Sequence, residues 1–528
     1  MLGTQVHKDL NLESIDSFVP LQTSWGKQRF RDGLTDCKTD KQELKTRQLP
    51  LLAMRIATEE RTTIRKALEN IQTAIVDDCI NNNDARIKES VGQIFWASNS
   101  IGSFLNASPI ALNVLCTWKT LVLPGFAVIM PLLAIIVPFF ILHFLHPEQE
   151  IHVAAYMEHL RTVLLQQIAI PSVLRSRSQD DRFGVLLESL FIGMTLVMFI
   201  SSIWNQISAS IHLRRIWFDL ETRGNSLRKT LACGFSVLKT LKSMPLKLQT
   251  AMQHVIDDGE ITMNACDHLH ELDSVATFGS IWNNNAPLLQ LKNWLGLIDV
   301  YTSISALDTV CFPTYVSKTS FVLRDVIHPE VSSCVPNSLR SDGHSILTGP
   351  NRGGKSTFMK SVALAVVTGQ SWGFAWAKSM KFRPFATIST ALEPCGKLGI
   401  ASTFEAEIEF AKSVLATGAL PHFVMMDEIF HSTNASDGVA ASQVFLRQLY
   451  QMNDVVSIIS THYRELTDMF AKETQQLQLL ADEDTNGKLL YSYMIGPGVS
   501  TKSSVMEILA ERGLLVNSSP GMNVAFKT

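Results

Sequence analysis

The sequence has no cysteine pattern of the kind that builds a disulfide framework or a zinc site. Its eight cysteines stand singly among 528 residues, with no C-x-x-C pair and no histidine at the spacing of a metal ligand. Such spacing is what identifies a zinc site or a disulfide scaffold from sequence. We therefore predict reduced thiols in a cytosol-like compartment, where disulfides are rare.

The sequence also has little net charge. Its 46 Lys and Arg residues are balanced by 49 Asp and Glu residues, which gives a net charge of −3. Surfaces that bind nucleic acids are usually strongly basic. The composition therefore offers no support for DNA as a partner, although a local basic stripe is compatible with a neutral total.

The first 40 residues lack both the apolar core of a signal peptide and the Arg-rich pattern of a transit peptide. They mix polar residues, Gly and Pro without the periodicity of a helix or a strand. We therefore predict that residues 1–40 form a poorly ordered lead-in.

Two long stretches lack every charged side chain. Residues 120–145 and residues 189–210 contain no Asp, Glu, Lys or Arg, and each stretch is long enough to cross a hydrocarbon layer of ~30 Å. Buried core helices are the alternative, but such helices rarely run so long without a charge. We predict a transmembrane hairpin with its connecting loop over residues 119–210.

The rest of the chain divides around this hairpin. Residues 41–118 and 211–312 have the composition and apolar spacing of helices. Several Arg and Lys residues follow the second uncharged stretch, and by the positive-inside tendency this end faces the cytosol, while a hairpin returns the N-terminus to the same side. The connecting loop also carries arginines, so this charge orients the hairpin only weakly. We predict both termini and the C-terminal domain in the cytosol, mainly because the nucleotide-binding motif described below needs cytosolic ATP. Residues 313–528 alternate short apolar strands with helices, which is typical of an α/β nucleotide-binding domain.

A phosphate-binding motif lies in this last region. The pattern G-x-x-x-x-G-K-[ST] follows a short apolar strand at residues 345–347 and precedes a helical stretch at residues 357–367. Glycines allow the backbone N–H groups to surround phosphate oxygens at a helix N-terminus. We predict that Lys355 reaches the β- and γ-phosphates of ATP and that Ser356 holds Mg²⁺. The predicted nucleotide-binding residues of this loop are Gly349, Pro350, Asn351, Arg352, Gly353, Gly354, Lys355, Ser356 and Thr357.

Two more apolar strands end in groups that can complete an ATPase site. Residues 423–426 lead to Asp427 and Glu428, and residues 455–460 lead to His462. We predict Asp427 on the Mg²⁺ side, Glu428 as the group that polarises the attacking water, and His462 as a γ-phosphate sensor. The alternatives are an acidic helix cap and a structural histidine.

Four motifs in this order resemble the ATPase of the MutS family. They are TGPNRGGKST at residues 348–357, STFEAE at 402–407, DEIFHSTNASDG at 427–438 and STHYREL at 460–466. The resemblance covers about residues 285–515. It implies that Asp427 and Glu428 are the Walker B pair and that His462 is the switch histidine.

The resemblance also implies a dimer of ATPase domains. In such a homodimer Ser402 would reach the γ-phosphate bound to the other subunit, and Asp437 would lie at the dimer seam. The chain departs from the family pattern at Phe430-His431-Ser432, where Gly-Arg-Gly is usual, and at Cys334, where an aromatic residue is expected near the adenine. A mismatch-reading domain with its Phe-x-Glu wedge is absent from the sequence before the helices.

These observations predict an α/β P-loop NTPase domain of the ABC/MutS type, C-terminal to a mainly α-helical bundle with an inserted transmembrane hairpin. The predicted function is a membrane-anchored ATPase that hydrolyses ATP with Mg²⁺ at composite dimer sites and moves its helical part on closure. One alternative is a soluble DNA-binding repair or recombination factor. Another is an ABC-type transporter ATPase, against which an LSGGQ-like signature is missing.

Overall fold

A computed structural model describes residues 4–81, 85–96, 99–145, 152–167, 181–393, 403–418, 420–484 and 488–512. The chain divides into two compact units. The sheet unit comprises residues 1–70, 234–261 and 291–528, and the helical unit comprises residues 71–233 and 262–290. The boundaries expected at residues 40, 118, 210 and 312 do not coincide with this division.

The sheet unit is built on a six-stranded sheet with the order β10-β9-β4-β8-β7-β6. Its strands are β4 (His344–Thr348), β6 (Thr387–Ala391), β7 (His422–Met426), β8 (Val455–Ser460), β9 (Thr474–Glu483) and β10 (Leu489–Pro497). Only the β9–β10 pair is antiparallel among these neighbours. Every residue of β7 and β8 is buried, as expected for parallel strands covered on both faces.

Helices cover both faces of this sheet. One face packs against α18 (Thr403–Leu415), α19 (Ala435–Leu449) and α20 (Arg464–Met469), with Val424, Ile459 and Phe445 in the shared apolar core. A further helix, α17 (Lys355–Ser371), is buried along almost its whole length. The last described helix is α21 (Val505–Glu511). Parallel strands between helical layers confirm the predicted α/β class for this region.

A smaller four-stranded sheet, with the order β1-β5-β2-β3, belongs to the same unit. It consists of β1 (Thr314–Tyr315), β2 (Phe321–Val326), β3 (Asn337–Ser341) and β5 (Ser379–Phe382). Phe321 and Phe382 are fully buried and pack edge to face. The predicted α/β region thus contains a second sheet, to which the strand at Phe321–Val326 belongs.

The prediction of a poorly ordered lead-in over residues 1–40 is wrong for the described residues. These residues form α1 (Thr4–Asp9), η1 (Ile15–Phe18) and α2 (Ser24–Leu34). Phe30 is fully buried, and its carbonyl accepts a hydrogen bond of 2.9 Å from Nε1 of Trp372. The apolar residues of this segment pack against residues far along the chain, so their order leaves no local periodicity.

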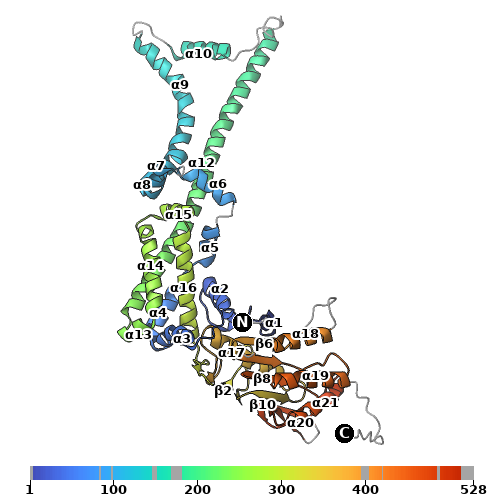
Figure 1. Ribbon diagram of the computed structural model, residues 1–528. Helices are drawn as coiled ribbons and strands as arrows, with labels where there is room; N and C mark the ends of the chain where they lie inside the picture. Colours follow the sequence, from blue (N-terminus) through green and yellow to red (C-terminus); the bar gives the residue numbers. More distant parts are fainter. Residues whose placement is uncertain are drawn as a thin grey trace. The chain divides into compact units, whose positions relative to one another are not determined.

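Helices make up the rest of the described chain (Figure 1). The sheet unit contains α3 (Lys41–Ile56), α4 (Thr58–Glu69) and α13 (Leu246–Ala251). The helical unit contains α5 (Thr73–Asn81), α6 (Ala85–Ile94), α7 (Ser100–Ala107), α8 (Pro109–Thr117), the π-helix η2 (Trp118–Val122), α9 (Leu123–Leu145), α10 (Val153–Gln167) and α15 (Ser274–Asn283). Three helices run through both units: α12 (Asp181–Ser243), α14 (Gln253–His270) and α16 (Ala286–Ser305).

The first uncharged stretch, residues 120–145, runs from the end of η2 through α9, and the second lies in α12. Among the described residues, two helical segments are long and apolar enough to span a membrane, Pro109–Met130 and Leu196–Ser243, and their most apolar windows are 11% and 0% buried. Ser210 on α12 donates a hydrogen bond of 2.5 Å to the carbonyl of Thr120, which precedes α9. Length and composition alone are weak evidence for a membrane span, so the transmembrane hairpin stays a prediction.

Candidate nucleotide-binding site

The predicted site residues follow three neighbouring parallel strands, β4, β8 and β7. The P-loop follows β4, His462 follows β8, and Asp427 and Glu428 follow β7. Carboxyl ends of parallel strands share one edge of a sheet, and this edge is where α/β proteins bind ligands. The fold therefore brings together motifs that are far apart in the sequence.

The P-loop needs its glycines for two different reasons. Gly354, which caps the N-terminus of α17, has a φ of 93°, a left-handed value that glycine adopts without strain. A Cβ at Gly349 would lie 2.8 Å from Cβ of Leu479. The loop thus passes close to β9 and turns directly into a helix N-terminus, where backbone N–H groups favour a phosphate.

Lys355 is the first residue of α17, and its side chain folds back into the loop. Its Nζ donates to the carbonyl oxygens of Gly349 at 2.9 Å and Pro350 at 3.3 Å. The residue is 5% exposed, and burial lowers the pKa of its ammonium group while Asp427 and Glu428 oppose that effect. The loop therefore concentrates one buried cation where phosphate oxygens would bind.

Two oxygen ligands suited to Mg²⁺ lie beside this cation. Ser356 Oγ donates to Oδ2 of Asp427 at 2.5 Å. Hydroxyl and carboxylate oxygens are the ligands that Mg²⁺ takes in phosphate-binding sites. The two predicted metal-side residues thus meet in the structure, and their arrangement fits the ion.

Glu428 is held by a turn and by a histidine. Its φ is 52°, and its Oε1 lies 3.2 Å from Nε2 of His462. The hydrogen bond from His462 lowers the pKa of the Glu428 carboxyl group, against the opposing effect of burial, and the charges of His462, His431 and Lys355 add to the lowering. The carboxylate is therefore charged at neutral pH and able to orient a water molecule.

Sequence reasoning missed Ser460, the last residue of β8. Its buried hydroxyl accepts a hydrogen bond of 2.8 Å from the backbone N–H of Glu428 and donates to Oδ1 of Asp427. The hydroxyl of Ser460 therefore links Asp427 to the backbone of Glu428. It stands inside the STHYREL motif, but only the pairing of β8 with β7 shows what its hydroxyl touches.

A second missed contact involves the unusual residue His431. Its Nδ1 lies 2.8 Å from the carbonyl oxygen of Glu428 and 3.3 Å from Oε1 of Glu407. Glu407 is 7% exposed, and burial raises the pKa of its carboxyl group. The departure from Gly-Arg-Gly thus places an imidazole between α18 and the turn that carries Glu428.

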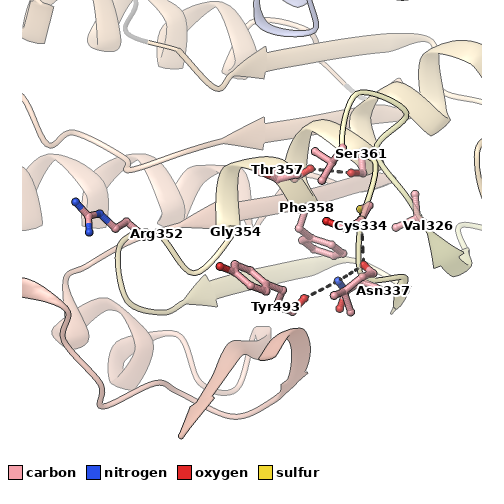
Figure 2. A pocket seen from close by; sticks show the side chains of 12 residues that line it. Val326, Cys334, Asn337, Arg352, Gly354, Thr357, Phe358, Ser361 and Tyr493 are labelled. Atoms are coloured by element: carbon pink, nitrogen blue, oxygen red, sulfur yellow. Dashed lines mark hydrogen bonds between the residues drawn. The ribbon is translucent and has the colours of Figure 1, made fainter. Parts of the chain in front are cut away.

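A cavity of about 350 Å³ opens on one side of the P-loop. Phe358 and Tyr493 contribute aromatic rings to its wall, next to Cys334 (Figure 2). The carbonyl of Tyr493 accepts a hydrogen bond of 2.9 Å from Asn337, which also accepts one of 2.7 Å from the N–H of Ile495. Asn337 therefore fixes the irregular part of β10 beside the loop. Cys334 stands where the family resemblance implies an aromatic residue. The cavity nevertheless has an aromatic wall, which Phe358 of α17 and Tyr493 of β10 supply.

A second cavity of about 350 Å³ lies along the other side of the loop. Asn351 and His462 line it, together with the cationic residues Arg464 and Lys502. Arg352 points to a different partner, because its guanidinium forms an ion pair with Glu511. Asn351 and Arg352, two neighbouring residues of the P-loop, thus have different surroundings: Asn351 lines this cavity, and Arg352 pairs with Glu511.

Two residues, Ser402 and Asp437, are expected at a dimer seam. Ser402 lies outside the described residues. Asp437 is exposed near the start of α19, where its backbone N–H donates to Oδ1 of Asn434 at 2.9 Å and its Oδ2 accepts from Nδ2 of Asn434 at 2.6 Å. Asp437 thus takes part in capping its own helix, and its role at a dimer seam stays a prediction.

Comparison with known proteins matches the region that carries this site. Residues 345–515 match the family "MutS domain V". The chain is 30% identical over 244 residues to the DNA mismatch repair protein MutS of Lactobacillus delbrueckii subsp. bulgaricus, an alignment that covers 43% of this chain and 28% of that protein.

Two further relatives are covered to a similar extent. The DNA mismatch repair protein MutS of Lactobacillus helveticus is 30% identical over 247 residues, 43% of this chain and 28% of that protein. The protein of that name from Leuconostoc mesenteroides is 28% identical over 246 residues. This alignment covers 44% of this chain and 29% of that protein. The matched part thus spans under a third of these relatives. Residues 345–515 therefore form a region similar to MutS domain V, and the similarity to the MutS proteins is confined to under half of this chain.

Proposed function

We propose that this protein binds and hydrolyses ATP with Mg²⁺. The observation that carries the proposal is the meeting of three groups at one sheet edge. These groups are the buried ammonium of Lys355, the Ser356–Asp427 pair and the Glu428–His462 pair. They supply a phosphate-directed cation, a metal position and a water-orienting carboxylate, which phosphoryl transfer to water needs. In this proposal Phe358 and Tyr493 form the wall for the adenine ring.

The test is release of phosphate from ATP by the purified full chain, measured with and without Mg²⁺. We expect Mg²⁺-dependent release by the wild-type chain. A chain that binds no ATP would contradict the proposal at its first step.

We also propose that hydrolysis takes place at sites shared between two subunits. Support comes from the family resemblance of Ser402 and Asp437. In a mixing experiment, a Ser402→Arg subunit keeps its P-loop while a Lys355→Ala subunit keeps Ser402. Their heterodimer contains one composite site with both intact halves, so its activity should exceed that of either variant alone. No recovery in demonstrated heterodimers would show that Ser402 acts only within its own subunit.

We propose further that α9 and the first part of α12 anchor the protein in a membrane and that ATP-driven closure moves this helical part. Large apolar side chains are exposed along both helices, for example Phe140 at 62%, Val197 at 65% and Trp204 at 69%. A soluble protein rarely exposes so large a continuous apolar surface. The core-helix alternative is disfavoured because the described side chains of these helices are largely unburied.

A charge scan tests the membrane anchor. Leu133→Arg and Val197→Arg each place a cation near the middle of a predicted span, at a cost of about 2.5–3.5 kcal/mol on insertion scales. Phe218→Arg is the matched control, because Phe218 is 70% exposed on the same helix α12 but lies beyond the predicted span. We expect only the first two variants to leave the carbonate-washed membrane fraction. A wild-type chain that is monodisperse without detergent would exclude the anchor.

A DNA-binding repair factor is the second candidate, because the relatives named above are DNA mismatch repair proteins. The balanced charge of the chain gives this candidate no electrostatic support. Salt-sensitive binding of duplex DNA by the full chain would favour it, since phosphate contacts release counterions.

A further inference from the structure

A buried carboxylate outside the nucleotide-binding loop touches the sheet close to the metal-side acid. Asp9 ends the N-terminal helix α1 and is 0% exposed. Its Oδ2 accepts hydrogen bonds from Oγ1 of Thr390 at 2.6 Å and from the N–H of Leu392 at 3.0 Å. Its Oδ1 accepts from the N–H of Glu393 at 3.2 Å and from Nε2 of Gln5 at 2.9 Å. A buried charge is tolerated only with such partners.

The position of β6 explains why a carboxylate is needed there. β6 is the last strand in the described six-stranded sheet, so its outer side has no neighbouring strand to pair with. Unpaired N–H groups at a sheet edge require another acceptor. Asp9 supplies that acceptor for two consecutive N–H groups just after β6, and it brings the N-terminal segment to the edge of the sheet.

The same end of β6 holds the metal-side acid. The backbone N–H of Asp427 donates to the carbonyl of Ala391 at 2.9 Å. On the outer side, Asp9 binds the residues before and after Ala391. Glu393, the next residue along, accepts a hydrogen bond of 3.2 Å from Lys360 of the P-loop helix α17. Residues 390–393, at the end of β6, thus contact Asp9, Asp427 and α17.

We propose that Asp9 is a positioning residue for the Mg²⁺ side of the ATP site. Its carboxylate fixes the end of β6, and the end of β6 fixes the backbone from which Asp427 reaches Ser356. This inference rests on the proposed ATPase function and assigns the N-terminal helix α1 a part in it. A change at Asp9 should therefore alter the Mg²⁺ concentration that ATP hydrolysis requires, and not only the stability of the chain.

Asp9→Asn tests the inference, because it keeps the size of the side chain and removes its charge. Asp16→Asn is the matched control. Asp16 is a second acid among the first 40 residues, is 3% exposed, and forms an ion pair with Arg31 at 3.0 Å. Outer partners of a metal ligand contribute about 10- to 100-fold to metal affinity. We expect the half-saturating Mg²⁺ concentration for ATP hydrolysis to rise about 10-fold in Asp9→Asn and to stay unchanged in Asp16→Asn.

Hydrogen exchange provides a readout that does not depend on ATP hydrolysis. The N–H groups of Leu392, Glu393 and Asp427 should exchange faster in Asp9→Asn than in the control. Thr390→Val, which removes one donor to Asp9, should give a smaller effect in the same direction if Asp9→Asn does not fold. An Asp9→Asn chain with the thermal stability of the control and an unchanged Mg²⁺ requirement would overturn the inference. So would unchanged exchange at Asp427, whether or not the wild-type chain hydrolyses ATP.

Discussion

Replacing Ser460 with alanine is the sharpest test of how the two acids are held. The hydroxyl accepts a hydrogen bond from the N–H of Glu428 and donates to Asp427, and the residue is 0% exposed. Ser460→Ala leaves the partly buried backbone N–H of Glu428 without its acceptor, which costs about 1–3 kcal/mol. If that loss acts entirely on the orientation of Glu428 in the transition state, kcat falls roughly 5- to 150-fold.

The measurement is kcat and KM for ATP, paired with the thermal unfolding midpoint. Ser457→Ala is the control, because Ser457 lies on the same strand, is 0% exposed and bonds His344 at 2.9 Å, away from the acids. Both variants should lose stability, but only Ser460→Ala should lose kcat. Equal kcat values in two equally destabilised variants would refute the assignment of Ser460 as a positioning residue.

Three further changes separate the roles of the predicted site residues. Lys355→Ala should abolish ATP binding in a filter-binding assay and leave the unfolding midpoint nearly unchanged, because the ammonium contacts loop carbonyls and not the apolar core. Glu428→Gln should bind ATP normally and hydrolyse it slowly, since the amide keeps the size of the side chain but loses the charge that orients water. A wild-type kcat in this variant would mean that another group orients the water. His462→Gln should move the acid limb of the kcat profile to higher pH, because the bond from His462 lowers the Glu428 pKa below its ordinary value of 4.5. The lowered pKa also stabilises the fold above that value, and this contribution is lost as the pH falls through the folded-state pKa.

The sequence was sufficient wherever the candidate site is built from residues close together in the chain. The P-loop, with Lys355 and Ser356, is one continuous motif, and Asp427 directly follows an apolar strand. Parallel strand pairing then brings strand ends together without further information. The strands predicted over residues 345–347, 423–426 and 455–460 are all present.

The contacts that could not be predicted join residues far apart in the sequence. Asp9 lies more than three hundred residues before Thr390, its hydrogen-bond partner. Tyr493 lines the cavity beside the P-loop from the part of β10 whose register shifts between residues 491 and 495. The first 40 residues were predicted to be poorly ordered because their apolar positions fit no helical or strand period. Tertiary packing, not local propensity, decides the structure of such segments.

The N-terminal segment also holds the far end of the P-loop helix. Near the C-terminus of α17, the carbonyl of Gln370 accepts a hydrogen bond from the N–H of Lys38 at 2.9 Å, and that of Ser371 accepts one from Arg47 at 2.9 Å. The last carbonyls of a helix lack partners within the helix, so these bonds fasten α17 to α3 and the residues before it. At its other end, α17 begins with Lys355 inside the P-loop. A nucleotide-driven shift of α17 must therefore break these bonds or carry α3 with it, and the second outcome is how the proposed ATPase would pass movement to its helices.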